Sequence, residues 1–229
     1  MSHSSTPPNS RVIELAETEV PRPVDPIGDR PKRIFDISFA CVSLLVLAPL
    51  MLLIFAALKI FEGGPAFYSH RRVGHAGREF GCLKFRTMSI DSAQRLRDLL
   101  ENDAGAAREW ARTHKLKNDP RISTLGRTLR RSSLDELPQL FNIIRGQMSV
   151  VGPRPVTATE LDRYGVAAEL YKRARPGLTG LWQVSRTDAT TYDMRVRHDV
   201  EYVINQSIRG DVVIIARTFR AVLSGEGAS

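Results

Sequence analysis

The chain of 229 residues carries 33 Lys and Arg against 25 Asp and Glu, a formal net charge of +8. This length predicts one domain with appendages, and the charge favours polyanionic partners such as nucleic acid, anionic lipid or nucleotide-like substrates. Aromatic residues at 7% and the lack of helix-turn-helix, zinc or RNP patterns argue against nucleic-acid binding. Two cysteines give no disulfide or metal framework and fit a reduced, cytosolic setting.

The first segment, residues 1–30, is predicted as a disordered tail. It contains five prolines together with Ser, Thr, Glu and Asp, and it has little apolar periodicity. It is not a signal peptide, because no apolar core follows a basic start.

From Ile37 to Leu58 the chain runs for 22 residues without a charge. Since a spanning helix needs about 20 apolar residues, we predict a membrane segment over 31–62 rather than a buried core helix. Pro49 lies near its middle, where it removes a helix hydrogen bond. Basic residues flank both ends, so the positive-inside rule gives no orientation. We predict two helical arms that meet at Ala48–Pro49 and enter and leave on the same face; the residues alone leave a kinked span open.

The remainder, residues 63–229, is predicted as one catalytic domain of α+β class, mostly helical. Short apolar pieces at 66–68 and 80–85 flank a turn-rich basic segment and predict a hairpin. Charged segments with spaced leucines predict helices over 91–115 and 122–131.

An isolated acidic pair stands out in the middle of this domain. Between Arg121 and Pro155 there are six arginines and only two acids, the neighbours Asp135 and Glu136. Guanidinium groups match phosphate oxygens, and a carboxylate can accept a phosphoryl group or bind magnesium. The alternative is a helix that begins near Pro138, with Asp135 as its N-cap and Glu136 as a first-turn acid. Local sequence leaves both interpretations open.

The C-terminal part, 192–223, is predicted as two helices divided near Gly210. In the second helix, one face gathers apolar side chains, and this face suits either an anionic membrane surface or ordinary core packing. The residues of this face are Val212, Ile215, Phe219, Val222 and Leu223.

Seven short blocks follow one another along the chain, the first directly before the apolar run and the other six after it. They are residues 32–36 (KRIFD), 64–68 (GPAFY), 84–88 (KFRTM), 119–122 (DPRI), 133–140 (SLDELPQL), 148–155 (MSVVGPRP) and 175–184 (RPGLTGLWQV). In this order they resemble the bacterial sugar transferase family, the monotopic phosphoglycosyl transferases. The ending, residues 202–229, and the pair Trp182-Gln183 resemble the exopolysaccharide-initiating members of that family. The resemblance covers residues 31–229. One departure is Ser185-Arg186-Thr187, where the family commonly has Gly-Arg one place later.

The resemblance implies an enzyme that moves a sugar 1-phosphate from a UDP-sugar to polyprenyl phosphate and releases UMP. The family's nucleophile matches Asp135, and its neighbour Glu136 assists with Mg²⁺ or with the protonation of the pair. The apolar segment is then a re-entrant helix broken at Pro49, with the catalytic domain on the cytoplasmic face of the bacterial inner membrane.

Basic residues within the matching blocks are the candidate phosphate ligands: Lys84, Arg86, Arg130, Arg154 and Arg175. Arg154 is the strongest, because prolines on both sides hold it in a rigid loop. The cationic surroundings also lead us to expect a lowered pKa for Asp135.

The expected partners are therefore a UDP-sugar donor, a polyprenyl phosphate acceptor and the lipid bilayer, with no nucleic acid. The sugar (galactose, glucose or an N-acetylated sugar) and the oligomeric state, a homo-oligomer included, stay open. The competing function is a non-catalytic, membrane-anchored protein that binds lipid phosphate, nucleotide or nucleic acid.

Overall fold

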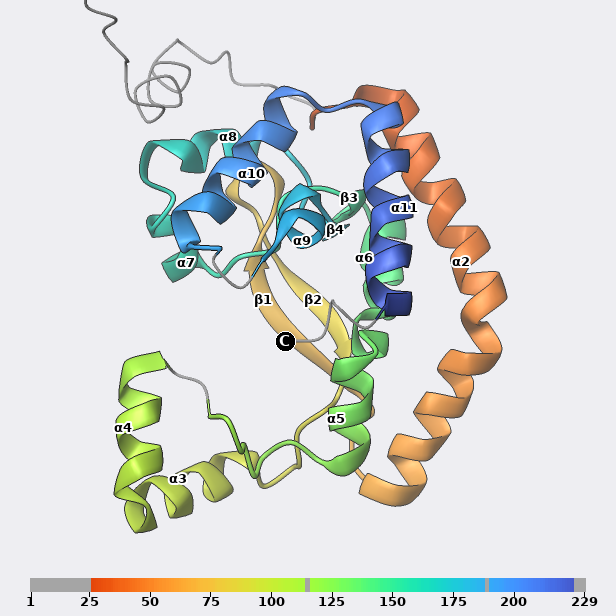
Figure 1. Cartoon of the computed structure of the whole chain (residues 1–229). Coiled ribbons are helices and arrows are strands. Elements are labelled where there is room, and N and C mark those ends of the chain that lie inside the picture. Colours follow the sequence, from red (N-terminus) through yellow and green to blue (C-terminus); the bar gives the residue numbers. More distant parts are fainter. Residues whose placement is uncertain (1–25, 114–115, 188–189, 225–229) are drawn as a thin grey trace, which may run out of the picture.

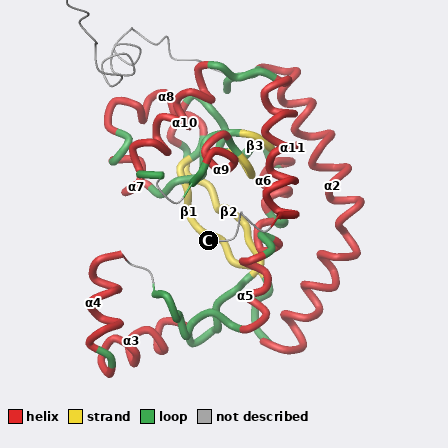
Figure 2. Tube along the Cα trace, in the orientation of Figure 1, coloured by secondary structure: helices red, strands yellow, loops and turns green. Residues whose placement is uncertain are grey.

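The computed structural model describes residues 26–113, 116–187 and 190–224 and has the mostly helical α+β architecture predicted (Figures 1 and 2). Residues 1–25 of the predicted tail lie outside the described residues. The helices are α2 Asp29–Ala57, α3 Ser92–Asn102, α4 Ala104–Thr113, α5 Thr124–Arg131, α6 Gln139–Ile144, α7 Ala158–Asp162, α8 Ala168–Lys172, α9 Leu181–Ser185, α10 Tyr192–Ile204 and α11 Ile208–Ser224. The strands are β1 Phe67–Val73, β2 Glu79–Phe85, β3 Ser149–Val151 and β4 Gly177–Thr179.

The apolar segment forms one continuous helix, α2, followed by a π-helical turn over Leu58–Glu62. The predicted break at Ala48–Pro49 is not confirmed, since Pro49 lies inside α2 and Figure 1 shows an unbroken, bowed ribbon. A proline removes a single backbone hydrogen bond, and a long helix accommodates this loss by bending. Within the described residues, this is the one helix long and apolar enough to cross a membrane.

One side of α2 packs on the rest of the protein near both of its ends. Close to its start, the Lys32 ammonium lies 2.9 Å from Asp36 Oδ1 and 2.6 Å from the Ser149 hydroxyl of β3. Close to its end, Ile54 and Leu58 join Phe85 in a buried apolar cluster. The opposite side of α2 exposes large apolar side chains, namely Val42, Leu45, Val46, Leu52 and Leu53.

The predicted hairpin is confirmed and is longer than expected. Strands β1 and β2 pair antiparallel, with Phe67 opposite Phe85 and Val73 opposite Glu79. The Asn142 side chain of α6 covers the outer edge of β2, because it accepts from the Leu83 N–H at 2.9 Å and donates to the Gly81 carbonyl at 2.8 Å. These two hydrogen bonds hold α6 against β2.

A second, parallel sheet of β3 and β4 lies in the interior and positions the loop over 153–155. Gly152 follows β3 directly and packs against the backbone of Arg175 and Gly177, so a Cβ at this position would clash with main-chain atoms. The close packing holds the start of the loop against β4 and lets it leave the sheet in one direction.

Two predicted helix boundaries are wrong. The segment 91–115 forms two helices, because the Asp103 carboxylate accepts from the N–H groups of Gly105 and Ala106 and caps a new start. These helices, α3 and α4, project from the body (Figure 1). The C-terminal helices divide at 205–207 rather than at Gly210, which lies within the first turn of α11 with its N–H on the Ser207 hydroxyl.

The apolar face predicted on α11 is exposed in part. Val212, Phe219 and Val222 face outward, whereas Ile215 packs against the main core. The side chain of Leu223 lies outside the described residues.

Candidate active site

The acidic pair lies in a 3-10 turn, Leu134–Glu136, between α5 and α6. Ser133, directly before it, has a left-handed backbone with φ of 57°, a conformation that non-glycine residues rarely adopt. The N-cap of α6 is Pro138, which makes no side-chain cap, so the interpretation of Asp135 as that helix's N-cap is wrong. Backbone strain next to an uncapped acidic turn is typical of a functional site.

Lys84, near the end of β2, brings the two carboxylates together. Its ammonium lies 2.6 Å from Glu136 Oε1 and 3.7 Å from Asp135 Oδ2. Asp135 is only 7% exposed, while Glu136 and Lys84 are half-buried. The hairpin thus supplies the cation that allows two neighbouring carboxylates to remain close in a sheltered place.

The pKa of Asp135 is raised above its ordinary value, so the expected lowering is wrong. Burial is the largest cause, and the charge of Lys84 opposes it; Glu136 raises the pKa further, and Arg130 lowers it. The sequence showed the cations, but it did not show that the carboxyl group would be withdrawn from water. A buried carboxylate with few water contacts is a stronger nucleophile than a hydrated one.

Two further predicted ligands lie near the pair. Arg154 is exposed, lies within electrostatic range of Glu136, and its guanidinium makes no hydrogen bond or ion pair with any described residue. Arg130 is also exposed; it donates from Nε to the Thr87 hydroxyl at 2.8 Å, and its charge reaches Asp135. Both guanidinium groups can therefore donate hydrogen bonds to phosphate oxygens.

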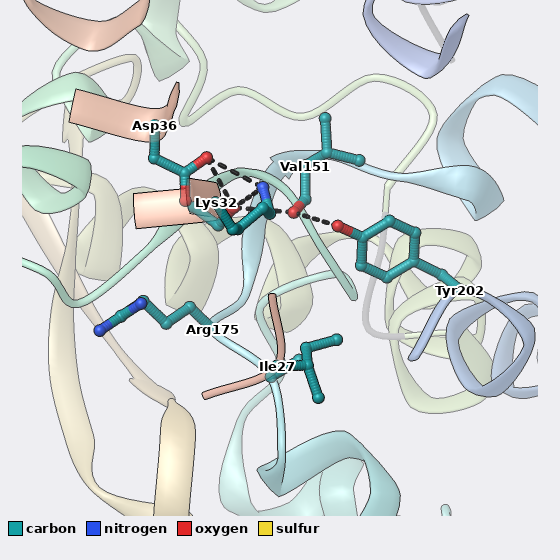
Figure 3. A pocket seen from close by; sticks show the side chains of 8 residues that line it. Ile27, Lys32, Asp36, Val151, Arg175 and Tyr202 are labelled. Carbon is teal, nitrogen blue, oxygen red and sulfur yellow. Dashed lines mark hydrogen bonds and ion pairs between the residues drawn. The ribbon is translucent and has the colours of Figure 1, made fainter. Parts of the chain in front are cut away.

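The other two predicted ligands lie elsewhere. Arg86 is buried and donates to the Gly63 carbonyl at 2.5 Å, with Glu62 3.8 Å away, so it fixes the turn that follows α2. Arg175 donates to the Gly146 carbonyl at 2.9 Å and borders a cavity of about 10 Å³ beside Lys32 and Asp36 (Figure 3). None of these contacts of the two side chains reaches the acidic pair.

The sequence did not predict a network of charged side chains from β1, α7 and α10 that reaches the Arg154 backbone. Glu160 of α7 pairs with Arg72 of β1 at 2.8 Å and lies 3.8 Å from Arg195 of α10. The buried Asp199 of α10 accepts from the Tyr164 hydroxyl at 2.7 Å and from the Arg154 backbone N–H at 3.4 Å. The one available sequence signal was Thr157-x-x-Glu160, a capping box that the structure contains.

The departure at Ser185-Arg186-Thr187 lies at the end of α9, where the Arg186 guanidinium sits 5.8 Å from the centre of the Trp182 ring. This arginine, which directly follows α9, therefore lies over an aromatic side chain of that helix.

At the candidate site, the acidic pair supplies the carboxylates that could bind a metal ion. Within the described ranges, no group of three or more His, Cys, Asp or Glu side chains could hold a metal. Magnesium, however, is commonly bound by one or two carboxylates together with substrate phosphates. Asp135 and Glu136 fit that arrangement once a diphosphate lies beside them.

Comparisons with known proteins point to one family. The family model described as bacterial sugar transferase matches residues 28–225. The chain is 51% identical over 205 residues to the exopolysaccharide production protein ExoY of Rhizobium meliloti, covering 90% of this chain and 91% of that protein. It is 47% identical over 197 residues to the undecaprenyl-phosphate galactose phosphotransferase of Salmonella typhimurium, covering 86% of this chain and 41% of that protein.

A third relative differs in the sugar named. The UDP-glucose:undecaprenyl-phosphate glucose-1-phosphate transferase of Xanthomonas campestris pv. campestris is 37% identical over 205 residues, which cover 86% of this chain and 40% of that protein. All three alignments include the greater part of the helix, hairpin and acidic turn described above.

Proposed function

Because this chain belongs to the bacterial sugar transferase family, we propose that it transfers a sugar 1-phosphate from a UDP-sugar to polyprenyl phosphate, with release of UMP. The product, a polyprenyl diphosphate sugar, begins the synthesis of an exopolysaccharide. The names of the relatives support this reaction class, and they include both galactose and glucose enzymes. The observation that carries the proposal is the acidic pair held by Lys84 within electrostatic range of Arg154, whose guanidinium pairs with no residue that the structure describes.

The first chemical step in this proposal is carried out by Asp135. A carboxylate oxygen attacks the β-phosphorus, which bears the sugar, and the bond to the bridging oxygen breaks. UMP leaves with that oxygen, and Asp135 becomes an acyl phosphate. The partly buried position of Asp135 supports this role, because it keeps water from hydrolysing such an intermediate.

In the second step an oxygen of the polyprenyl phosphate attacks the same phosphorus and releases the Asp135 carboxylate. Charge builds up on phosphoryl oxygens in both steps, and Arg154 and Arg130 would stabilise it. The support is that the charge of Arg130 acts on Asp135 and that Arg154 lies within electrostatic range of Glu136. Lys84 keeps Glu136 and Asp135 together between the two steps.

Asp135 and Glu136 would hold Mg²⁺ together with the diphosphate of the donor. The ion would neutralise phosphate charge and stabilise the departing UMP. Glu136 is the more exposed of the two carboxylates, so it could bind a cation while it keeps its ion pair with Lys84.

We also propose that α2, a continuous and bowed helix here, bends further at Pro49 when it meets a bilayer, so that it re-enters the membrane and both of its ends lie on the cytoplasmic face of the inner membrane. The support is that Lys32, near the start of α2, and Leu58, just after its end, both pack on the same domain. A helix with its ends on opposite sides of a bilayer could not make both contacts. Its outward apolar face would meet lipid.

The reaction is tested by incubating the purified protein with undecaprenyl phosphate, Mg²⁺ and a panel of UDP-sugars. Continued UMP release, beyond one UMP per chain, that requires undecaprenyl phosphate and forms one lipid-linked sugar phosphate per UMP supports the proposal and identifies the sugar. Binding of both substrates without UMP release for any UDP-sugar would instead support the non-catalytic anchored protein.

A further inference from the structure

One face of the β1–β2 hairpin continues the active site beyond Lys84. Side chains alternate along a strand, and directly paired residues share a face. Lys84 is paired with Tyr68, and Cys82 with His70. His70 is therefore a diagonal neighbour of Lys84 on the face that carries the contact to the acidic pair.

Arg72, the next residue of β1 on this face, is fixed from both sides. It pairs with Glu160 at 2.8 Å through Nη1 and lies 3.0 Å from His70 Nδ1 through Nη2. Glu160 is itself held, since its carboxylate accepts the Thr157 N–H at 2.9 Å in the capping box. A carboxylate thus orients a guanidinium, which in turn orients an imidazole.

This arrangement determines the tautomer of His70. Arginine can only donate hydrogen bonds, so His70 Nδ1 must be the acceptor and the ring proton lies on Nε2. Burial lowers the pKa of His70, and the charge of Arg72 lowers it further. His70 is accordingly a neutral imidazole at neutral pH, and its Nε2–H has no hydrogen-bond partner among the described residues.

The surroundings of this donor suit an anion. The positive charges of Arg72 and Lys84 act on His70, and so does the negative charge of Glu160, which is paired with Arg72. Arg154 and Glu136 lie within electrostatic range of Cys82, the cross-strand partner of His70. We propose that His70 is a further phosphate-binding residue of this active site, whose Nε2–H donates to a phosphoryl oxygen of a substrate, and that Arg72 positions it. The phosphate belongs either to the UDP-sugar or to the polyprenyl phosphate.

The test compares His70→Phe, which keeps a ring without a donor, with His70→Gln, which restores an amide donor. Arg71→Ala is the matched control, because Arg71 adjoins this row but points to the opposite face and is 87% exposed in its side chain. KM is measured for the UDP-sugar at saturating lipid and for undecaprenyl phosphate at saturating donor.

His70→Phe should raise one of these two KM values about tenfold or more, as expected for a lost hydrogen bond to a charged group. The KM that rises identifies the substrate. His70→Gln should recover most of the loss, and Arg71→Ala should change neither KM. The melting temperature of each variant is measured alongside.

The positioning role of Arg72 has its own readout. Arg72→Met removes a charge that lowers the pKa of His70, so the affected KM should gain a dependence on pH between about 5.5 and 8. This dependence should vanish in the Arg72→Met/His70→Phe double variant.

Two results would overturn the inference: a folded His70→Phe with both KM values within twofold of the wild type, or equal kinetic and thermal losses in His70→Phe and His70→Gln. The inference rests on the proposed transfer reaction. An inactive wild type would overturn that reaction, whereas an active wild type with unaffected His70 variants would overturn only the assignment of His70.

Discussion

Lys84 lies 2.6 Å from Glu136 and is held there by the strand pairing of β2. Its charge also opposes the rise that burial causes in the pKa of Asp135, so this ammonium favours the ionised form of the proposed nucleophile. The hairpin therefore contributes to the chemistry and is more than a support for α6.

We predict that Lys84→Met moves the acid limb of the pH–rate profile to higher pH. Asp135 must be ionised to attack, its pKa is already raised by burial, and the loss of Lys84 removes the largest influence that lowers it. Activity should partly recover as the pH is increased. An acid limb at the wild-type position would mean that a group other than Asp135 controls it.

Arg154→Ala should lower kcat/KM about a hundredfold or more, because we propose that this exposed guanidinium stabilises charge on the transferred phosphate. It lies within electrostatic range of Glu136 and has no ion-pair partner in the described part of the chain. Arg108→Ala, on the projecting helix α4, is the control and should stay near wild type. Equal, mild losses in the two variants would remove Arg154 from the site.

Arg86 should contribute to the stability of the fold and not to phosphate binding. Arg86→Met leaves the Glu62 carboxylate buried without its cation and should destabilise the fold by about 3 kcal/mol. The Glu62→Gln/Arg86→Met double variant should regain part of the melting temperature in detergent. An Arg86→Met protein with unchanged melting temperature and lost turnover would restore Arg86 to the candidate phosphate ligands.

Topology can be measured in intact cells. We expect that Ser4→Cys and Ser229→Cys, each in a chain with Cys41 and Cys82 replaced by serine, react with a membrane-impermeant reagent only after lysis. Labelling of one position in intact cells would mean that α2 spans the membrane.

Local patterns predicted much of the framework. The alternating hairpin, α5 after its Ser123 cap, and α6 after Pro138 depend on nearby residues and were recovered. The continuity of α2 was not, because the sequence shows that Pro49 weakens a helix but not how the packing at both ends holds it together.

Long-range contacts explain what was missed in the site. Arg72 and Glu160 are 88 residues apart, and no local pattern relates them. Arg86 and Arg175 lie in blocks that match the family, as Lys84 and Arg154 do, yet their side chains donate to backbone carbonyls elsewhere. Burial of Asp135, which reverses the expected direction of its pKa shift, likewise depends on tertiary packing.

The most direct test is the intact mass of the protein after incubation with a UDP-sugar and Mg²⁺ in the absence of lipid. The account predicts one added sugar phosphate per chain, one UMP released, and loss of both in Asp135→Asn, while Glu136→Gln slows turnover without moving the modification to another residue. An adduct that persists in Asp135→Asn, or UMP that forms only when undecaprenyl phosphate is present, would contradict the covalent mechanism.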